Sequence, residues 1–209
     1  MPRRERENTL PSFSAALAAG ADGIELDVHA TADGVVVVHH DAQIAGRVSI
    51  AGTAWRELRR VADEAGLEIP TLTSVCELVG ERAELFVEIK GADIERDVVD
   101  VLRGFRGRSA IHSFDHAAIT RLAQLDRSLR LGLLFEDRVP DVAAMLAAAG
   151  ASDAWPQYSL VDDSLVQAVH GAGGRVIAWT VNDRTDIERL SALGVDGLCT
   201  DDVTLVGGS

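Results

Sequence analysis

The most constraining feature of this sequence is a regular alternation of short apolar runs with longer amphipathic segments. Runs of strand length lie at 22–28, 34–40, 85–90, 110–113, 131–135, 154–157, 175–181 and 194–199. Segments with helical periodicity lie at 9–20, 70–79, 94–102, 116–125, 139–149, 163–171 and 184–193. Short connections between such elements indicate parallel strands joined by crossover helices. The alternation therefore predicts an α/β fold, and a (β/α)8 TIM barrel before an open doubly wound sheet, whose glycine-rich phosphate turn is missing.

The length of the chain fits one barrel near the lower size limit for that fold. The sequence has 209 residues, with no linker, low-complexity segment or charge block that would mark a boundary. We therefore expect a single domain over residues 1–209. The first helical segment begins near residue 10, and only residues 201–209 follow the last strand. The expected barrel is therefore truncated at its first strand and short at its last helix.

The overall charge excludes several classes of partner. There are 20 basic and 33 acidic residues, which gives a net charge of −13 and argues against binding nucleic acid or anionic membranes through bulk electrostatics. No apolar run could span a bilayer, and the N-terminus has no apolar signal region. The two cysteines, Cys76 and Cys199, are too few for a disulfide framework. We expect a cytoplasmic protein with no nucleic-acid or membrane partner, and the oligomeric state stays open.

Four charged residues on two predicted strands are expected to meet at one site. Alternate residues of a strand share a face, so Glu25 lies beside Asp27 and Glu88 lies beside Lys90 near the strand ends where barrel enzymes build their sites. Three converging carboxylates resist ionisation unless a cation compensates them, and oxygen ligands favour Mg²⁺ or Ca²⁺. Lys90 is the only lysine among 20 basic residues and suits a phosphate oxygen. The alternative is a set of solvated strand-end charges in ordinary ion pairs.

One histidine is a candidate for proton transfer. His40 follows the apolar run 35–38, and an imidazole titrates near neutral pH. His39 has the opposite parity, so only one of the two can face a site at this strand end. The spacing assigns no chemistry to the remaining histidines, which are His29, His112, His116 and His170.

The order of motifs along the chain resembles the glycerophosphodiester phosphodiesterase family. The resemblance extends from Glu7 to Asp201, and many pieces in one order with sensible spacing make it specific. The motifs are Glu7-Asn-Thr9, Gly23-Ile-Glu-Leu-Asp-Val28, Thr31-x-Asp-Gly34, Val38-x-His40-Asp41, Pro70-Thr-Leu72, Glu88-Ile-Lys90, Ser113-Phe-Asp115, Trp179-Thr-Val-Asn182 and Thr200-Asp201.

The resemblance implies a metal-dependent (β/α)8 barrel that splits glycerophosphodiesters into an alcohol and glycerol 3-phosphate. It implies that a glycerol hydroxyl attacks phosphorus, that two histidines move the protons, and that water opens the resulting cyclic phosphate. Trp179 has an alternative role as a core aromatic residue. The implied site consists of Glu25, Asp27 and Glu88 as ligands of Mg²⁺ or Ca²⁺, His40 and Lys90 as catalytic residues, and Lys90, Trp179 and Glu7 as substrate-binding residues.

The sequence departs from the family pattern at its start. Family members carry a His-Arg-Gly motif that here would lie before Met1, and residues 2–6 contain no histidine. Arg3, Arg4 or Arg6 could reach the phosphate, but none can shuttle a proton at neutral pH. Because an acid–base group contributes roughly 10²–10⁴-fold to the rate, we expect weak or absent turnover from residues 1–209 alone.

Two explanations of this departure stay open. The sequence is a fragment or begins at the wrong methionine, or it is a true short form. The alternative function is a non-catalytic barrel that binds metal and phosphoesters. A third possibility, the related lipid-cleaving phospholipase D branch, is disfavoured because no secretory or membrane-binding segment is visible.

Overall fold

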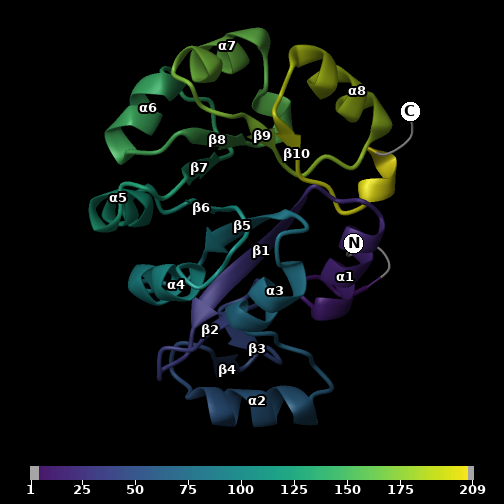
Figure 1. Cartoon of the computed structure of the whole chain (residues 1–209), viewed down its shortest axis with the longest axis vertical. Coiled ribbons are helices and arrows are strands. Elements are labelled where there is room, and N and C mark those ends of the chain that lie inside the picture. Colours follow the sequence, from purple (N-terminus) through teal and green to yellow (C-terminus); the bar gives the residue numbers. More distant parts are fainter. Residues whose placement is uncertain (1–4, 207–209) are drawn as a thin grey trace. The chain divides into compact units, whose positions relative to one another are not determined.

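The computed structural model of the chain describes residues 5–206. It contains two compact units, Met1–Ser109 and Ala110–Ser209 (Figure 1). Parallel strands and connecting helices build both units, in agreement with the predicted α/β class. The single domain over residues 1–209 stays a prediction.

The first unit is organised around the long strand β1 (Gly23–Ala30). One edge of β1 pairs in parallel with β5 (Glu84–Ile89), and the other pairs antiparallel with β2 (Val36–Val38). The five residues 31–35 between these strands are too few for a crossover helix, so the second apolar run returns along β1 as a hairpin. The hydroxyl of Thr31 stabilises this turn by accepting a hydrogen bond from the Val35 amide at 3.0 Å.

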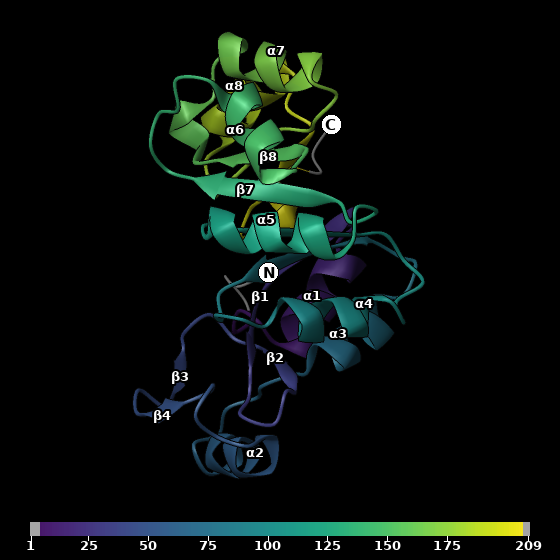
Figure 2. The ribbon, with the colours of Figure 1, turned by 90° about the vertical axis from the view of Figure 1, so that its left-hand side faces the viewer.

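Three helices flank the strands of this unit (Figure 2): α1 (Leu10–Ala18), α3 (Leu72–Val79) and α4 (Glu95–Leu102). Threonines at the N-caps of α1 and α3 start both helices, because each side-chain oxygen accepts a backbone N–H of the first turn. The helix α1 contacts β1 and α3 contacts β2, while α1 and α4 both contact α3. The helices α1 and α3 thereby pack against β1 and β2.

Residues 41–69, for which the sequence pattern predicts no element, fold into a small subdomain. It consists of the hairpin β3 (Gln43–Ile44) and β4 (Val48–Ser49), followed by the amphipathic helix α2 (Trp55–Glu64). Its core is a separate apolar cluster of Val37, Ile44, Ile50, Leu58, Ala62 and Ile69. Strands of two residues are too short for a periodic signal, so this subdomain is not visible in the sequence pattern.

The second unit repeats the strand–helix module. The strands β6 (Ser109–Ser113), β7 (Leu131–Phe135) and β8 (Asp153–Pro156) run parallel in that order, and β9 (Ile177–Ala178) pairs in parallel with β10 (Gly197–Leu198). Isolated parallel bridges, such as that between Ala154 and Val176, connect β8 with the β9 segment. The predicted runs 175–181 and 194–199 therefore contain shorter strands than expected.

Helices lie along the outer side of these strands (Figure 1). They are α5 (His116–Leu125), α6 (Val142–Ala149), α7 (Asp163–Gly171) and α8 (Arg184–Leu193), with short 3-10 helices η1 (Tyr158–Leu160) and η2 (Val203–Leu205). An aspartate caps each of the four α-helices by accepting a backbone N–H at 2.8–3.0 Å: Asp115, Asp141, Asp162 and Asp183. Within residues 5–206, no helix has both the length and the apolar character needed to cross a lipid bilayer.

Candidate active site

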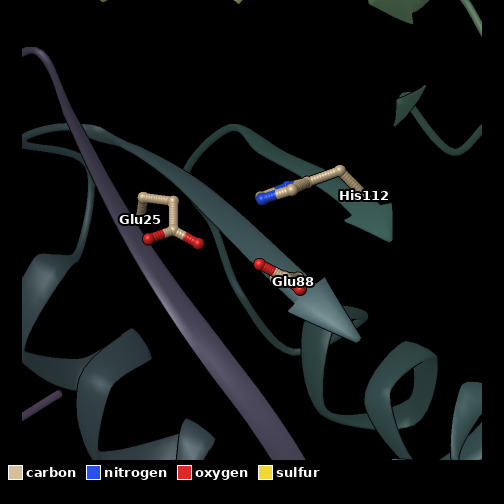
Figure 3. A group of neighbouring side chains, drawn as sticks. All are labelled: Glu25, Glu88 and His112. Atoms are coloured by element: carbon tan, nitrogen blue, oxygen red, sulfur yellow. The ribbon is translucent and has the colours of Figure 1, made fainter. Parts of the chain in front are cut away.

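Two carboxyl groups on neighbouring parallel strands form the centre of the site. Glu25 lies on β1 and Glu88 on β5, and their side chains approach each other (Figure 3). One carboxylate oxygen of Glu25 lies within 4.8 Å of one carboxylate oxygen of Glu88. Burial, followed by the charge of Asp27, raises the pKa of Glu25 to about 8. Burial also raises the pKa of Glu88 to about 7. Two carboxylates placed in this way require a nearby positive charge to be ionised together at neutral pH.

Lys90 supplies one positive charge next to this pair. The strand register places Asp27 opposite Glu88, and Lys90 follows directly after β5. The ammonium of Lys90 donates a hydrogen bond to Glu88 Oε1 at 2.7 Å and lies 3.4 Å from Asp27 Oδ1. Burial alone would lower the pKa of Lys90, but the hydrogen bond and charge of Glu88, with the charge of Asp27, raise it above its usual value. Lys90 is therefore a charged, half-buried ammonium between two carboxylates.

The assigned strands differ in one respect from the expectation that these charges lie at strand ends. Glu25 and Asp27 lie within β1, because that strand continues through Ala30 as the hairpin with β2. The parallel pairing with β5 ends at Val28, only one residue beyond Asp27. Asp27 therefore lies at the end of the parallel region, whereas Glu25 lies two residues before it.

Asn8 is a residue of this site to which the sequence pattern assigns no role. Its side-chain amide donates to Asp27 Oδ2 at 2.8 Å, and its Oδ1 accepts the Asp27 backbone N–H at 3.2 Å. Asp27 thus has Asn8 at one carboxylate oxygen and Lys90 at the other, and it is not part of the group of mutually close ligand atoms that contains Glu25 and Glu88. The metal-ligand role of Asp27 stays a prediction. The motif Glu7-Asn-Thr9 was the available signal, since its asparagine directly precedes the α1 cap.

We expect substitutions of Asn8 to separate backbone strain from side-chain bonding. Asn8 has a φ of 56°, a left-handed conformation that asparagine tolerates and alanine does not. Asn8→Gly should lower the free energy of unfolding by about 1.5–3 kcal/mol through the lost hydrogen bonds to a carboxylate. Asn8→Ala should lower it by about 1 kcal/mol more. Urea denaturation of both variants measures these terms, and an Asn8→Gly variant as stable as wild type would show that the bonds contribute nothing.

The histidine pair lies in the segment that follows β2. The backbone N–H of His39 donates to the carbonyl of Asp27 at 3.0 Å, which fastens the segment to β1. His40 Nδ1 lies 2.9 Å from Asp41 Oδ1, and this hydrogen bond raises the pKa of His40. The His40 side chain is 55% exposed, so it is accessible to a substrate. His39 instead bonds locally to the Asp41 backbone.

The remaining predicted residues of the first unit lie at its surface. Glu7 is exposed, and its charge adds a small upward contribution to the pKa of Glu25 after those of burial and Asp27. Arg6 is exposed and uses its backbone carbonyl to accept the Thr9 hydroxyl at 2.7 Å. Arg3 and Arg4, named above as possible phosphate contacts, lie outside the described residues. The substrate-binding role of Glu7 stays a prediction.

Trp179 belongs to an aromatic group of the second unit. Its indole N–H donates to the Trp155 carbonyl at 2.9 Å, and its ring meets Phe114 edge to face with centroids 5.4 Å apart. Trp179 is half-buried and Phe114 is 44% exposed, so part of this pair is accessible to solvent. His112, which Figure 3 also labels, is buried in this unit and stacks on Trp155 at 4.0 Å. This geometry is compatible both with a pocket wall and with a core role for Trp179.

Comparison with known proteins identifies the family to which the chain is similar. The sequence model of the glycerophosphoryl diester phosphodiesterase family matches residues 1–205, nearly the whole chain. The chain belongs to this family. Its members hydrolyse glycerophosphodiesters, so the predicted family, activity and enzyme class, a phosphoric diester hydrolase, are confirmed.

Individual relatives extend this result to the fold. The glycerophosphodiester phosphodiesterase of Caldanaerobacter subterraneus subsp. tengcongensis is 32% identical, over 94% of this chain and 88% of that protein. The crystal structure of the glycerophosphodiester phosphodiesterase from Thermotoga maritima matches with a TM-score of 0.85 and 25% identity, over 97% of this chain and 92% of that one. The structure of an Oleispira antarctica phosphodiesterase in complex with the product sn-glycerol-3-phosphate matches with a TM-score of 0.86 and 24% identity, over 96% of this chain and 89% of that one. The predicted (β/α) barrel fold class is thereby confirmed.

Proposed function

We propose that the hydrolysis of glycerophosphodiesters to an alcohol and glycerol 3-phosphate uses a divalent cation held by the acidic cluster on β1 and β5. The observation that carries the proposal is the close approach of Glu25 and Glu88, whose oxygens lie within 4.8 Å and whose pKa values rise to about 8 and about 7. Such a pair is unfavourable by itself and becomes favourable with a bound cation.

The chemistry of the cluster fits a hard divalent ion. Glu25 and Glu88 offer carboxylate oxygens, as does Asp27 on the same two-strand platform, and this ligand type favours Mg²⁺ or Ca²⁺ over zinc or copper. When bound, a divalent ion supplies Lewis-acid stabilisation of phosphoryl oxygens. Asn8 and Lys90 keep the Asp27 carboxylate oriented, as outer partners of metal ligands commonly do.

Lys90 is proposed to attract and position the phosphodiester. Its ammonium is charged and lies beside Glu88 and Asp27, and its side chain is 21% exposed, so its field reaches the surface of the cluster. A compact ammonium suits a phosphate oxygen as a point charge. Glu7 and Trp179 are proposed as further substrate contacts, since Glu7 is exposed near the cluster and part of the Trp179 ring pair is accessible.

His40 is proposed to move a proton during cleavage. The carboxylate Asp41 Oδ1 can only accept, so the hydrogen bond places a proton on His40 Nδ1 and leaves Nε2 to exchange a proton with the substrate. The hydrogen bond to Asp41 raises the pKa of His40 and so increases its protonated fraction at a given pH, which suits protonation of a leaving alcohol oxygen. Its exposure gives the substrate access to this nitrogen.

The decisive experiment measures glycerol 3-phosphate release from glycerophosphocholine by an N-terminally extended chain, with and without Mg²⁺ or Ca²⁺. We expect release to require the ion, and Glu25→Ala to weaken ion binding in titration calorimetry by about 100-fold or more. His40→Ala should lower the rate roughly 10²–10⁴-fold while leaving ion binding intact. Glu81→Gln, at an exposed turn, is the matched control and should change neither.

Two outcomes would contradict the proposal. Ion binding without any release from an N-terminally extended chain would favour the non-catalytic binding function. Release that persists in EDTA or in Glu25→Ala would exclude the acidic cluster as the metal site.

We also propose that the protein acts in the cytoplasm on a small-molecule substrate. The composition supports this location, because a chain with only Cys76 and Cys199 has no disulfide framework to maintain, and no disulfide joins these two residues. Cell fractionation with a tagged chain measures it directly.

A further inference from the structure

A second histidine lies directly beneath the segment that carries His40. His29, on β1 opposite Val37 of β2, is only 6% exposed. Its ring nitrogen Nε2 lies 3.1 Å from the backbone carbonyl oxygen of His40. A carbonyl can only accept a hydrogen bond, so Nε2 must carry the proton and donate it. The contact therefore fixes both the tautomer of His29 and the position of the His40 main chain.

We infer that His29 is a positioning residue for His40, acting through this side-chain hydrogen bond to the His40 carbonyl. The inference rests on the proposed function, in which His40 moves the proton. His29 does not touch the substrate in this scheme. It fixes the position of the His40 backbone, and thereby the position of the reactive Nε2 of His40.

Hydrogen bonds hold three consecutive residues at the end of β2 and just after it, and His29 provides the third of these bonds. The Val38 amide donates to the Pro70 carbonyl at 2.8 Å, and the His39 amide donates to the Asp27 carbonyl at 3.0 Å. The His29 ring then holds the carbonyl of His40 itself. Two of these hydrogen bonds involve residues of β1, Asp27 and His29, which are two positions apart. The strand that carries Asp27 therefore also fixes the position of the backbone at His39 and His40.

The segment at Gly91 packs closely against the backbone of His29. A Cβ at Gly91 would lie 3.3 Å from His29 Cα, so the chain packs closely against β1 at this point. Gly91 also donates its N–H to the Val28 carbonyl at 3.2 Å. A purely structural role for His29 would depend on its volume in this packed site. A positioning role depends on a hydrogen-bond donor at the position of Nε2, which gives the two roles different consequences.

Three substitutions separate these roles. His29→Gln places an amide N–H₂ near the Nε2 position, His29→Phe keeps the ring volume without a donor, and His29→Asn carries a donor that is too short to reach. We expect His29→Phe and His29→Asn to lower kcat roughly 10–100-fold with KM and Mg²⁺ binding nearly unchanged, because a displacement near 1 Å costs about that much. His29→Gln should recover kcat to within about threefold of wild type. His29→Asn keeps the test open if His29→Phe does not fold.

A spectroscopic measurement makes the test independent of turnover. The ¹³Cε1–¹H signal of His40, assigned by its loss in His40→Ala, should coincide in wild type and His29→Gln and move toward that of an unconstrained histidine in His29→Phe and His29→Asn. Unchanged kcat and an unchanged His40 signal in both His29→Phe and His29→Asn would overturn the inference. If His40→Ala keeps full activity, the proposed function of His40 fails instead, while the His40 signal still decides whether His29 positions it.

Discussion

In the absence of metal we expect the protein to lose stability as the pH rises from about 5 to about 8, and Glu25→Gln to remove much of this loss. The pKa of Glu25 rises from 4.5 to about 8 on folding because of burial, with a further contribution from Asp27. Below pH 4.5 both states carry the proton, so this group leaves stability unchanged. Between the two values the unfolded state has lost the proton that the folded state keeps, so stability falls as the pH rises. Glu88, with a pKa of about 7, acts in the same direction.

The expected size makes this effect easy to detect. One pKa unit corresponds to about 1.4 kcal/mol, so the coupled pair should contribute a few kcal/mol between pH 5 and pH 8. For a chain of this size each kcal/mol shifts Tm by roughly 2–4 °C. Thermal denaturation in EDTA across this pH range measures the loss, and at pH 8 the Glu25→Gln variant should be the more stable protein.

Addition of Mg²⁺ or Ca²⁺ should reverse the order of the two proteins. A cation that binds the folded state stabilises it by mass action, by about 2.7 kcal/mol at a concentration 100 times its Kd. Wild type gains this stabilisation, whereas Glu25→Gln, with a neutral amide in place of a ligand oxygen, does not. Glu81→Gln should behave like wild type throughout. A metal-free wild type whose stability is flat or rising over this range would show that the cluster carries no such cost.

This expected reversal would distinguish the cluster from an ordinary ion-pair network. Lys90 offsets part of the negative charge at 2.7 Å from Glu88 and 3.4 Å from Asp27, yet the pKa values of Glu25 and Glu88 still rise. One ammonium is therefore insufficient for three carboxylates. The folded chain retains an excess of negative charge that, in the proposed function, a bound divalent ion would cancel.

The sequence was sufficient to predict this cluster because strand parity and parallel pairing leave few arrangements. Alternation along β1 puts Glu25 and Asp27 on one face, and parallel pairing brings Glu88 opposite Asp27. The occurrence of a single lysine pointed to Lys90, which the structure places between Glu88 and Asp27. Regular geometry of this kind is encoded locally, so it can be read from spacing.

The residues that support the cluster could not be predicted in this way. Asn8 reaches Asp27 across 19 positions of sequence, and His29 bonds a backbone carbonyl that lies 11 positions away. Both contacts depend on the path of an irregular segment, which no periodicity specifies. The subdomain at residues 41–69 escaped prediction for a related reason, since its strands β3 and β4 have only two residues each.

The second large effect is expected at Asp153, a residue to which no chemistry is assigned. Asp153 begins β8, and its side chain is 0% exposed. Arg130 donates to it through Nε and Nη2 at 2.7–3.1 Å, and Arg175 donates through Nε and Nη2 at 2.6–3.1 Å. These arginines directly precede β7 and, two residues ahead, β9, so one carboxylate ties together the starts of three strands. A buried charge with this many partners is costly to leave unbalanced.

We expect Asp153→Asn to lower the free energy of unfolding by about 3–5 kcal/mol, because the amide keeps the volume but presents an N–H₂ group to two guanidinium groups. Arg130→Ala should cost less, since Arg175 still pairs with the carboxylate. Arg138→Ala is the matched control, because its partner Asp162 and Arg138 itself are 43% and 75% exposed, and such surface pairs contribute about 1 kcal/mol or less. Urea denaturation of the three variants measures the series.

The order within that series distinguishes a buried charge from a simple count of hydrogen bonds. If each bond contributed independently, removal of Arg130 would cost more than half as much as the change at Asp153, since three of the five arginine bonds described above come from Arg130. If burial of the charge dominates, the change at Asp153 costs far more, because both guanidinium groups lose their counterion at once while each single arginine loss leaves the carboxylate compensated. A cost at Asp153 below about 1 kcal/mol would place this triad among ordinary surface pairs and would remove it from any account of how β7, β8 and β9 are held in register.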